Sequence, residues 1–140
     1  MKRLIVDTGI WYAAFDESDD KHSYSQVIKK LLDEYNIIIP FPSLYETLNT
    51  RFIRNKHHQV DSLNILLKDP NKVLLVNDDN YRERALKAVT TLPYKYSLVD
   101  MIIRLMIEDT SLGSVALLTF NVKDFVGINN TEIIDPQSLQ

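Results

Sequence analysis

Short runs of apolar residues alternate along the chain with longer stretches in which apolar residues recur every three or four positions. Four short runs are rich in aliphatic residues, a composition typical of strands buried inside a parallel sheet. They cover residues 4–6, 37–39, 73–76 and 115–119. We expect a fifth, shorter strand at Ile133-Ile134, on the edge of the sheet.

The longer stretches have the spacing of amphipathic helices, which carry apolar residues on one face. We expect helices over residues 10–15, 22–35, 43–55, 60–67, 79–90 and 98–108. Ser97 stands where it can cap the last of these helices. Ser43 stands at the equivalent place in the third helix, and Glu46 follows it at the spacing of a capping box.

The alternation of strands and helices predicts the fold class. Strands joined by helices form right-handed crossovers, so we expect an α/β protein with a mainly parallel sheet of four to five strands, covered on both faces. No repeat, low-complexity stretch or linker interrupts the sequence, so residues 1–140 are expected to form a single domain. Ligands of such folds bind beyond the carboxyl ends of the strands, where Asp7, Asn121 and Asp124 stand.

Composition and charge exclude some functions and leave others open. The chain contains no cysteine, which excludes disulfides and thiolate zinc sites. A net charge of −3 argues against nucleic-acid binding through a broadly basic surface, although acids filled with cations can still meet phosphate. No apolar run is long enough to span a bilayer, and Asp7 interrupts the first one too early for a signal peptide. We therefore expect a soluble, cytoplasmic protein without a membrane partner.

Four acids each stand beside an apolar element of the sequence: Asp7, Glu46, Asp100 and Asp124. An acid in such a place is often partly buried. An unpaired buried carboxylate is unfavourable, so several of these acids need a shared cation or basic partners. Carboxylate oxygens are hard ligands, which suit Mg²⁺ or Mn²⁺.

Four segments that contain these acids resemble the PIN-domain family in their order and separation. They are Ile5-Val6-Asp7-Thr8-Gly9, Pro42-Ser43-Leu44-Tyr45-Glu46, Tyr96-Ser97-Leu98-Val99-Asp100 and Leu117-Leu118-Thr119-Phe120-Asn121-Val122-Lys123-Asp124-Phe125. Each motif alone has little specificity, but the ordered set is fairly specific and spans nearly the whole chain. The length resembles stand-alone members, many of which are toxins of the VapC type. The resemblance implies an α/β/α sandwich and a Mg²⁺- or Mn²⁺-dependent endoribonuclease.

The resemblance also assigns residues to the active site. Its first three acids fall on Asp7, Glu46 and Asp100. Many members carry aspartate where this chain has Asn121, and others have asparagine there and the acid three residues later, at Asp124. The acids are expected to be catalytic and to bind metal together with Asn121, while hydroxyl groups hold a metal-bound water; these supporting residues are Thr8 and Thr119. Water would attack the phosphodiester in line, because bound cations lower the pKa of water and offset charge on the phosphate.

Partners follow from the same resemblance. Toxins of this kind are commonly dimers that a partner peptide inhibits in the acid groove. The resemblance therefore implies RNA as the substrate, an antitoxin protein as a partner, and a homodimer.

Each candidate residue also has an ordinary structural interpretation. Asp7 before Thr8-Gly9 is common turn chemistry, and Glu46 fits the capping box. Asp100 suits the first turn of its helix, and Asp124 suits a loop. Two aromatic groups have open roles as well: Tyr94-Lys95-Tyr96 either stacks a base or packs, and a second group lies in the core or a dimer interface, namely Trp11, Tyr12 and Phe15.

Two other functions remain as alternatives. One is a catalytically weak or inactive PIN-like module that binds RNA or protein, and Asn121 is the argument for it. The other is a phosphatase or related metal-assisted hydrolase on a different α/β sheet. Such enzymes often end the first strand in paired acids, whereas here Asp7 is followed by Thr8-Gly9, which counts against this alternative.

Overall fold

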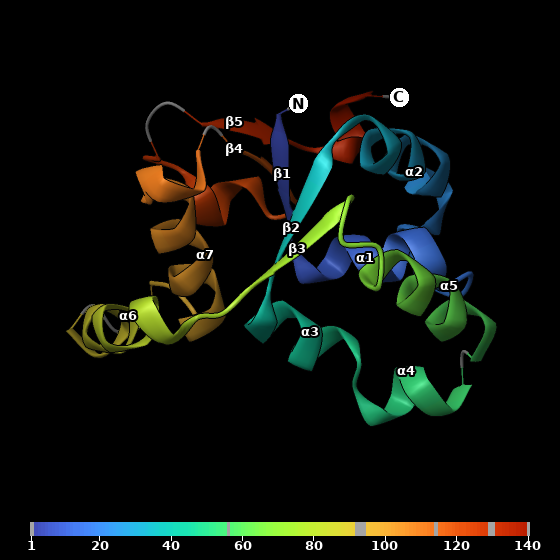
Figure 1. Ribbon diagram of the computed structural model, residues 1–140, viewed down its shortest axis with the longest axis horizontal. Helices are drawn as coiled ribbons and strands as arrows, with labels where there is room; N and C mark the ends of the chain where they lie inside the picture. Colours follow the sequence, from blue (N-terminus) through green and yellow to red (C-terminus); the bar gives the residue numbers. More distant parts are fainter. Residues whose placement is uncertain (1, 56, 92–94, 114, 129–130, 140) are drawn as a thin grey trace.

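The computed structural model describes residues 2–55, 57–91, 95–113, 115–128 and 131–139 of the chain. Five parallel strands form one sheet in the order β3-β2-β1-β4-β5 (Figure 1). The strands are β1 (Arg3–Val6), β2 (Asn36–Pro40), β3 (Val73–Val76), β4 (Val115–Leu118) and β5 (Glu132–Ile134). The predicted α/β class and parallel sheet are confirmed, and the short fifth strand lies at an edge as expected.

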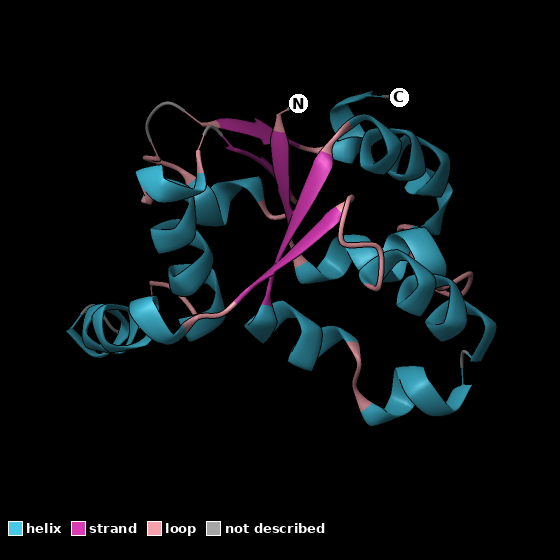
Figure 2. Ribbon diagram, in the orientation of Figure 1, coloured by secondary structure: helices cyan, strands magenta, loops and turns pink. Residues whose placement is uncertain are grey.

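Helices cover both faces of the sheet (Figure 2). On one side lie α1 (Thr8–Phe15), α2 (Ser25–Glu34) and α5 (His57–Leu67). On the other side lie α6 (Asp79–Thr91) and α7 (Leu98–Glu108). Two further helices, α3 (Phe41–Thr47) and α4 (Thr50–Asn55), continue from the carboxyl end of β2. Short 3-10 helices add η1 (His22–Tyr24), η2 (Thr110–Leu112), η3 (Val122–Phe125) and η4 (Pro136–Leu139).

Two hydrophobic cores lie on the two faces of the sheet, because neighbouring strand residues point to opposite sides. In β1, Leu4 and Val6 pack in the core that contains Trp11, whereas Ile5 packs in the core that contains Ile103. All five side chains are at most 1% exposed. The central strands are therefore apolar at every position, which explains why they appear in the sequence as continuous runs. Trp11 belongs to the core, one of the two roles expected for it.

The third predicted helix is wrong in its beginning and in its length. Pro40 ends β2 and caps α3 without a side-chain hydrogen bond, and Pro42 occupies the first turn, where a missing N–H does no harm. Ser43 consequently lies inside the helix, fully buried, and its hydroxyl has no hydrogen-bond partner among the described residues. The predicted capping box between Ser43 and Glu46 does not form.

Asn49 divides the predicted helix of residues 43–55 into α3 and α4. Its side-chain oxygen accepts a hydrogen bond from the backbone N–H of Phe52, at 3.0 Å, and so begins a new helix. The remaining predicted elements are correct to within a few residues. The helix expected from residue 22 starts as η1 and continues as α2, and α5 begins at His57 rather than at residue 60.

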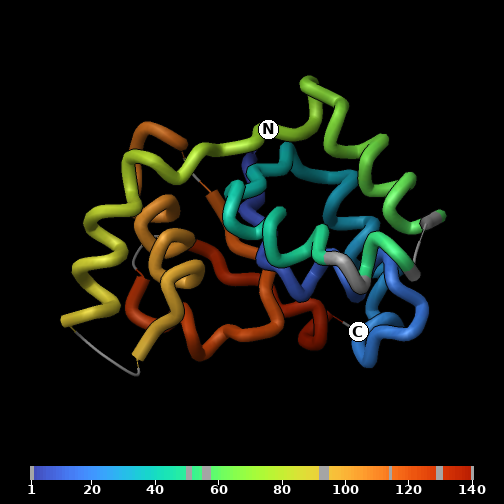
Figure 3. The backbone as a smooth tube through the Cα atoms, turned by 90° about the horizontal axis from the view of Figure 1, so that it is seen from below, coloured from blue at the N-terminus to red at the C-terminus, as the bar shows by residue number. Residues whose placement is uncertain are grey.

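The carboxyl ends of the strands meet at one edge of the sheet, and Figure 3 looks onto the molecule from that side. The segments that follow β1, β2 and β4 all leave the sheet here. None of the helices in the described ranges is long and apolar enough to cross a membrane.

Candidate metal-binding active site

Asp7 lies at the carboxyl end of β1 and is 7% exposed. One of its carboxylate oxygens, Oδ1, accepts a hydrogen bond of 2.8 Å from the backbone N–H of Thr8, so Asp7 caps α1. The other oxygen, Oδ2, accepts a hydrogen bond of 2.8 Å from the Thr119 hydroxyl. The turn-forming role considered for Asp7 is therefore real, and it fixes the carboxylate at the edge where a ligand would bind. Burial raises the pKa of Asp7, the two hydrogen bonds oppose that rise, and the negative charge of Asp124 adds to it.

Thr119 follows β4 and joins two parts of the site. It is fully buried, and its backbone N–H donates to the carbonyl of Ile134 at 3.1 Å. Its hydroxyl donates to Asp7 and accepts a hydrogen bond of 3.0 Å from the backbone N–H of Asn121. A hydroxyl has one hydrogen to donate. In this structure that hydrogen is committed to Asp7, so Thr119 supports the carboxylate directly.

Glu46 projects from α3 toward α1. Its carboxylate oxygen Oε1 accepts a hydrogen bond of 2.9 Å from the Thr8 hydroxyl. Thr8 and Glu46 were both predicted from the sequence, and the structure brings them together although 38 positions separate them.

Tyr12 and Asn49 also hold Glu46 in place, and they were missed in the sequence. The Tyr12 hydroxyl donates to the Glu46 carbonyl at 2.7 Å, and the Asn49 side-chain amide donates to the same carbonyl at 3.0 Å. Asn49 also donates to the Tyr12 hydroxyl at 2.7 Å. The available signal was the spacing of Thr8 and Tyr12, since residues four apart share one face of a helix.

Asp100 lies in the first turn of α7. The helix is capped by Ser97, whose hydroxyl oxygen accepts a hydrogen bond of 3.0 Å from the backbone N–H of Asp100. The first-turn position considered for Asp100 is therefore confirmed. Burial and the negative charge of Asp7 nevertheless raise the pKa of Asp100 to about 6, against the lowering effect of Ser97. The charges of Asp124 and Glu46 raise it further, so all four predicted acids act on one another at this edge.

Asp124 and Asn121 differ in what they contribute. Asp124 lies in η3, where its backbone N–H donates to the Asn121 carbonyl at 3.0 Å, and its charge acts on both Asp7 and Asp100. Asn121 is exposed and brings no charge. Of the two candidates for the fourth position, Asp124 is the one that adds to the negative field of the site.

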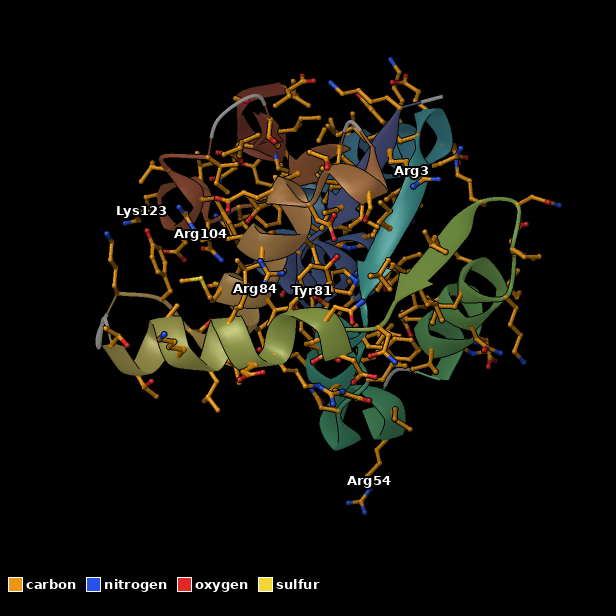
Figure 4. All side chains as sticks on the ribbon, turned by 60° about the vertical axis from the view of Figure 1, so that its left-hand side comes forward. Arg3, Arg54, Tyr81, Arg84, Arg104 and Lys123 are labelled. Carbon is orange, nitrogen blue, oxygen red and sulfur yellow. The ribbon has the colours of Figure 1, made fainter. Side chains whose placement is uncertain are left out.

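Arg104 is a further residue of the site that the sequence did not indicate. It lies four residues after Asp100 on α7, a spacing at which acid and base often pair. Its guanidinium instead donates from Nη1 to the carbonyls of Asp124, at 3.2 Å, and Val126, at 3.1 Å. Arg104 thereby ties η3 to α7 (Figure 4).

The four acids have no basic partner among the residues that the structure describes, where the ion pairs join Lys2 to Glu132 and Arg82 to Asp78 and Asp79. Within the same ranges, no group of three histidine or acidic side chains is arranged to hold a metal ion. The donors are nevertheless hard oxygens that carry negative charge. Mg²⁺ usually keeps several waters and binds through one or two carboxylates together with substrate phosphate. The side chains therefore fit an open magnesium site and not a closed cage.

Comparisons with known proteins agree on the fold. No protein-family model matches the chain, and no curated protein matches it. Among solved structures, VapC20 of Mycobacterium tuberculosis, a toxin that cleaves the sarcin-ricin loop, is similar with a TM-score of 0.65 and 18% identity, over 91% of this chain and 97% of that one. VapBC2 of Rickettsia felis, bound to a DNA fragment from its promoter, gives a TM-score of 0.62 and 19% identity, over 95% and 98%.

A toxin–antitoxin complex from Klebsiella pneumoniae is similar as well, with a TM-score of 0.61 and 24% identity, over 95% of this chain and 97% of that one. All three likenesses extend over nearly the full length of both chains. The chain therefore has the PIN-like fold of the VapC-type toxins, as the resemblance in its sequence predicts.

Proposed function

We propose that the protein is a Mg²⁺- or Mn²⁺-dependent endoribonuclease that hydrolyses RNA phosphodiester bonds and acts as the toxin of a type II toxin–antitoxin pair. One observation carries the proposal. Four carboxylates share the carboxyl edge of a parallel sheet, in a fold used by a toxin that cleaves RNA, and no described basic residue neutralises them. Such a set favours a divalent cation, which in turn attracts phosphate.

The residues of this chain would divide the work as follows. Asp7 is held rigidly by Thr8 and Thr119 and would be the fixed ligand, while Asp100 and Asp124 bring charge from the opposite side of the site. Glu46, oriented by the Thr8 hydroxyl, would accept a proton or a water-mediated contact. A bound divalent cation lowers the pKa of water and offsets charge on the phosphate in the transition state. Asn121 would contribute only its neutral amide.

The same proposal includes the partners implied by the sequence. We infer an antitoxin protein as the inhibitor, a homodimer as the working form, and the cytoplasm as the place where toxin, antitoxin and RNA meet. The printed descriptions of two similar structures support the antitoxin, because both are complexes of a toxin with its antitoxin or include both components.

A cleavage assay tests the proposal. Purified protein is incubated with a pool of structured RNAs and Mg²⁺ or Mn²⁺, and the products are resolved on a gel. We expect cutting that EDTA stops and that Asp7→Asn and Asp100→Asn each reduce by at least about 100-fold, since even outer residues of metal sites are worth 10- to 100-fold. Asp61→Asn, an exposed acid on α5, is the matched control and should cut like the wild type.

The rival function is a PIN-like module that binds RNA or protein without cutting. It would be supported if the folded, antitoxin-free protein binds RNA but leaves it intact with both metals. Restored cutting by Asn121→Asp would then identify the missing fourth carboxylate as the reason.

A further inference from the structure

Two positive side chains flank Tyr96 beside the acid cluster. The Arg104 guanidinium carbon lies 4.6 Å from the centre of the Tyr96 ring, and the Lys95 ammonium lies 5.4 Å from it. Both distances are those of cation–π contacts, which place the two cations within about 10 Å of each other. Tyr96 itself is half-buried and packs against the core on the α7 side of the sheet. The described part of Tyr94-Lys95-Tyr96 therefore packs, and Tyr94 lies outside the described residues.

A third positive side chain, Lys123, extends the same surface. It precedes Asp124 in η3 and is exposed, and η3 is the segment that Arg104 binds through two carbonyls. Figure 4 shows Lys123 and Arg104 on the same side of the molecule. We call Lys95, Arg104 and Lys123 the basic edge. It adjoins the acids at two points, because Lys95 lies two residues before the cap of the Asp100 helix and Lys123 lies next to Asp124.

The charges of the basic edge are not used inside the protein. Among the described residues, none of its three side chains forms an ion pair, although Arg82 and Lys2 elsewhere do. Arg104 lies one helical turn from Asp100 yet donates to neutral carbonyls, so its positive charge is retained. Unpaired acids and unpaired bases thus stand side by side. A cation answers the acids, and the bases require an anion.

We propose that the basic edge binds the phosphodiester backbone of RNA and leads it across the acid cluster. The proposal rests on the proposed function and deepens it by naming the surface that holds the substrate. Arginine and lysine are the usual partners of backbone phosphates, and such contacts fix the position of a nucleic acid without selecting its sequence. Because the Tyr96 ring is engaged by two cations, it supports the basic edge and does not stack a base.

Salt-dependent RNA binding tests the basic edge without relying on cleavage. The affinity for a fluorescently labelled single-stranded RNA is measured by anisotropy between 50 and 300 mM KCl, a range of roughly one Debye length or less. Ca²⁺ fills the acid cluster in place of Mg²⁺, and a gel afterwards verifies that the RNA is intact. The variants are Lys95→Gln, Lys123→Gln and the double variant. Arg104 is left unchanged, because it also positions η3.

Each lost phosphate contact should lower the slope of log affinity against log salt by about 0.7, and the double variant by about 1.4. At 50 mM salt this corresponds to roughly eightfold weaker binding per side chain. The matched control is Lys29→Gln, which also removes an exposed lysine near an aromatic ring, 5.9 Å from the centre of Phe15, but on the α2 side of the sheet. The control should keep the wild-type slope.

The outcomes separate the two proposals. Unchanged slopes in both lysine variants, or losses equal to that of Lys29→Gln, would overturn the basic edge even if the wild type cleaves RNA. Reduced slopes in a protein that never cleaves would support the basic edge and refute the nuclease. Failure of the wild type to bind RNA, or preferential binding of a glutamate-rich peptide through the same lysines, would also overturn it.

Discussion

Replacing Asp100 with asparagine should stabilise the metal-free protein while it abolishes the activity. Burial and the charges of Asp7, Asp124 and Glu46 hold the pKa of Asp100 at about 6 in the folded protein, compared with 3.8 for the free group. The folded state therefore binds this proton more tightly than the unfolded state. Stability from this group is greatest below pH 4 and falls as the pH rises toward and through about 6.

The shift fixes the size of the effect. A rise of about 2 pKa units corresponds to roughly 3 kcal/mol of destabilisation when Asp100 is ionised, at about 1.4 kcal/mol per unit. Asparagine removes that charge but also removes a favourable interaction with the amino end of α7, worth about 0.5–1 kcal/mol. The net gain for Asp100→Asn at pH 8 is therefore about 2 kcal/mol. For a chain of 140 residues this raises the melting temperature by roughly 6–8 °C.

Thermal unfolding followed by circular dichroism measures the change. The melting temperatures of the wild type, Asp100→Asn and the control Asp61→Asn are compared at pH 4 and pH 8, in EDTA and in Mg²⁺. The gain should disappear at pH 4, where Asp100 is protonated in the wild type. Mg²⁺ should stabilise the wild type more than the variant, since binding to the folded state alone adds about 2.7 kcal/mol at 100 times the dissociation constant. A variant no more stable than Asp61→Asn at pH 8 in EDTA would refute the strained acid cluster.

Three further predictions follow from the contacts of the site. Thr119→Val should lower the free energy of unfolding by roughly 2 kcal/mol in urea titrations at pH 8, because it removes the donor to the buried Asp7 carboxylate; a loss below 0.5 kcal/mol would contradict the role of that bond. Tyr12→Phe should cost about 1 kcal/mol and slow cleavage through Glu46, whereas Tyr35→Phe, whose hydroxyl has no partner among the described residues, should do neither. Cleavage should decline as the pH falls through about 6, since Asp100 must lose its proton to bind metal; a rate that is flat from pH 5 to 8 would exclude it as a ligand.

The sheet could be predicted from the sequence because each strand is encoded locally. Residues 4–6 and 37–39 are apolar at every position, since both faces of a central parallel strand are buried. The α7 helix was equally accessible, because its cap at Ser97 and its apolar periodicity act within a few residues. The acids were found in the same way, as polar residues that interrupt apolar elements.

The packing of α3 and η3 could not be predicted, because it depends on contacts between distant segments. Ser43 fits a capping box locally, but Pro40 and Pro42 begin the helix earlier and bury the serine. Arg104 has the spacing of an ion pair with Asp100, and only the folded position of η3 explains why it binds carbonyls. Local patterns therefore located the acids, whereas the residues that orient them depend on the tertiary structure.

The arrangement of Asp100 and Arg104 argues that the site is built for exchangeable partners. A direct ion pair between them would relieve the repulsion among the acids and would also occupy the ligand that a cation needs. Holding Arg104 on the backbone of η3 leaves both charges available at a cost in stability, which is the cost that Asp100→Asn should recover. If Arg104 were instead present to neutralise Asp100, the Asp100→Asn protein would lose stability at pH 8, so the melting experiment decides between the two roles.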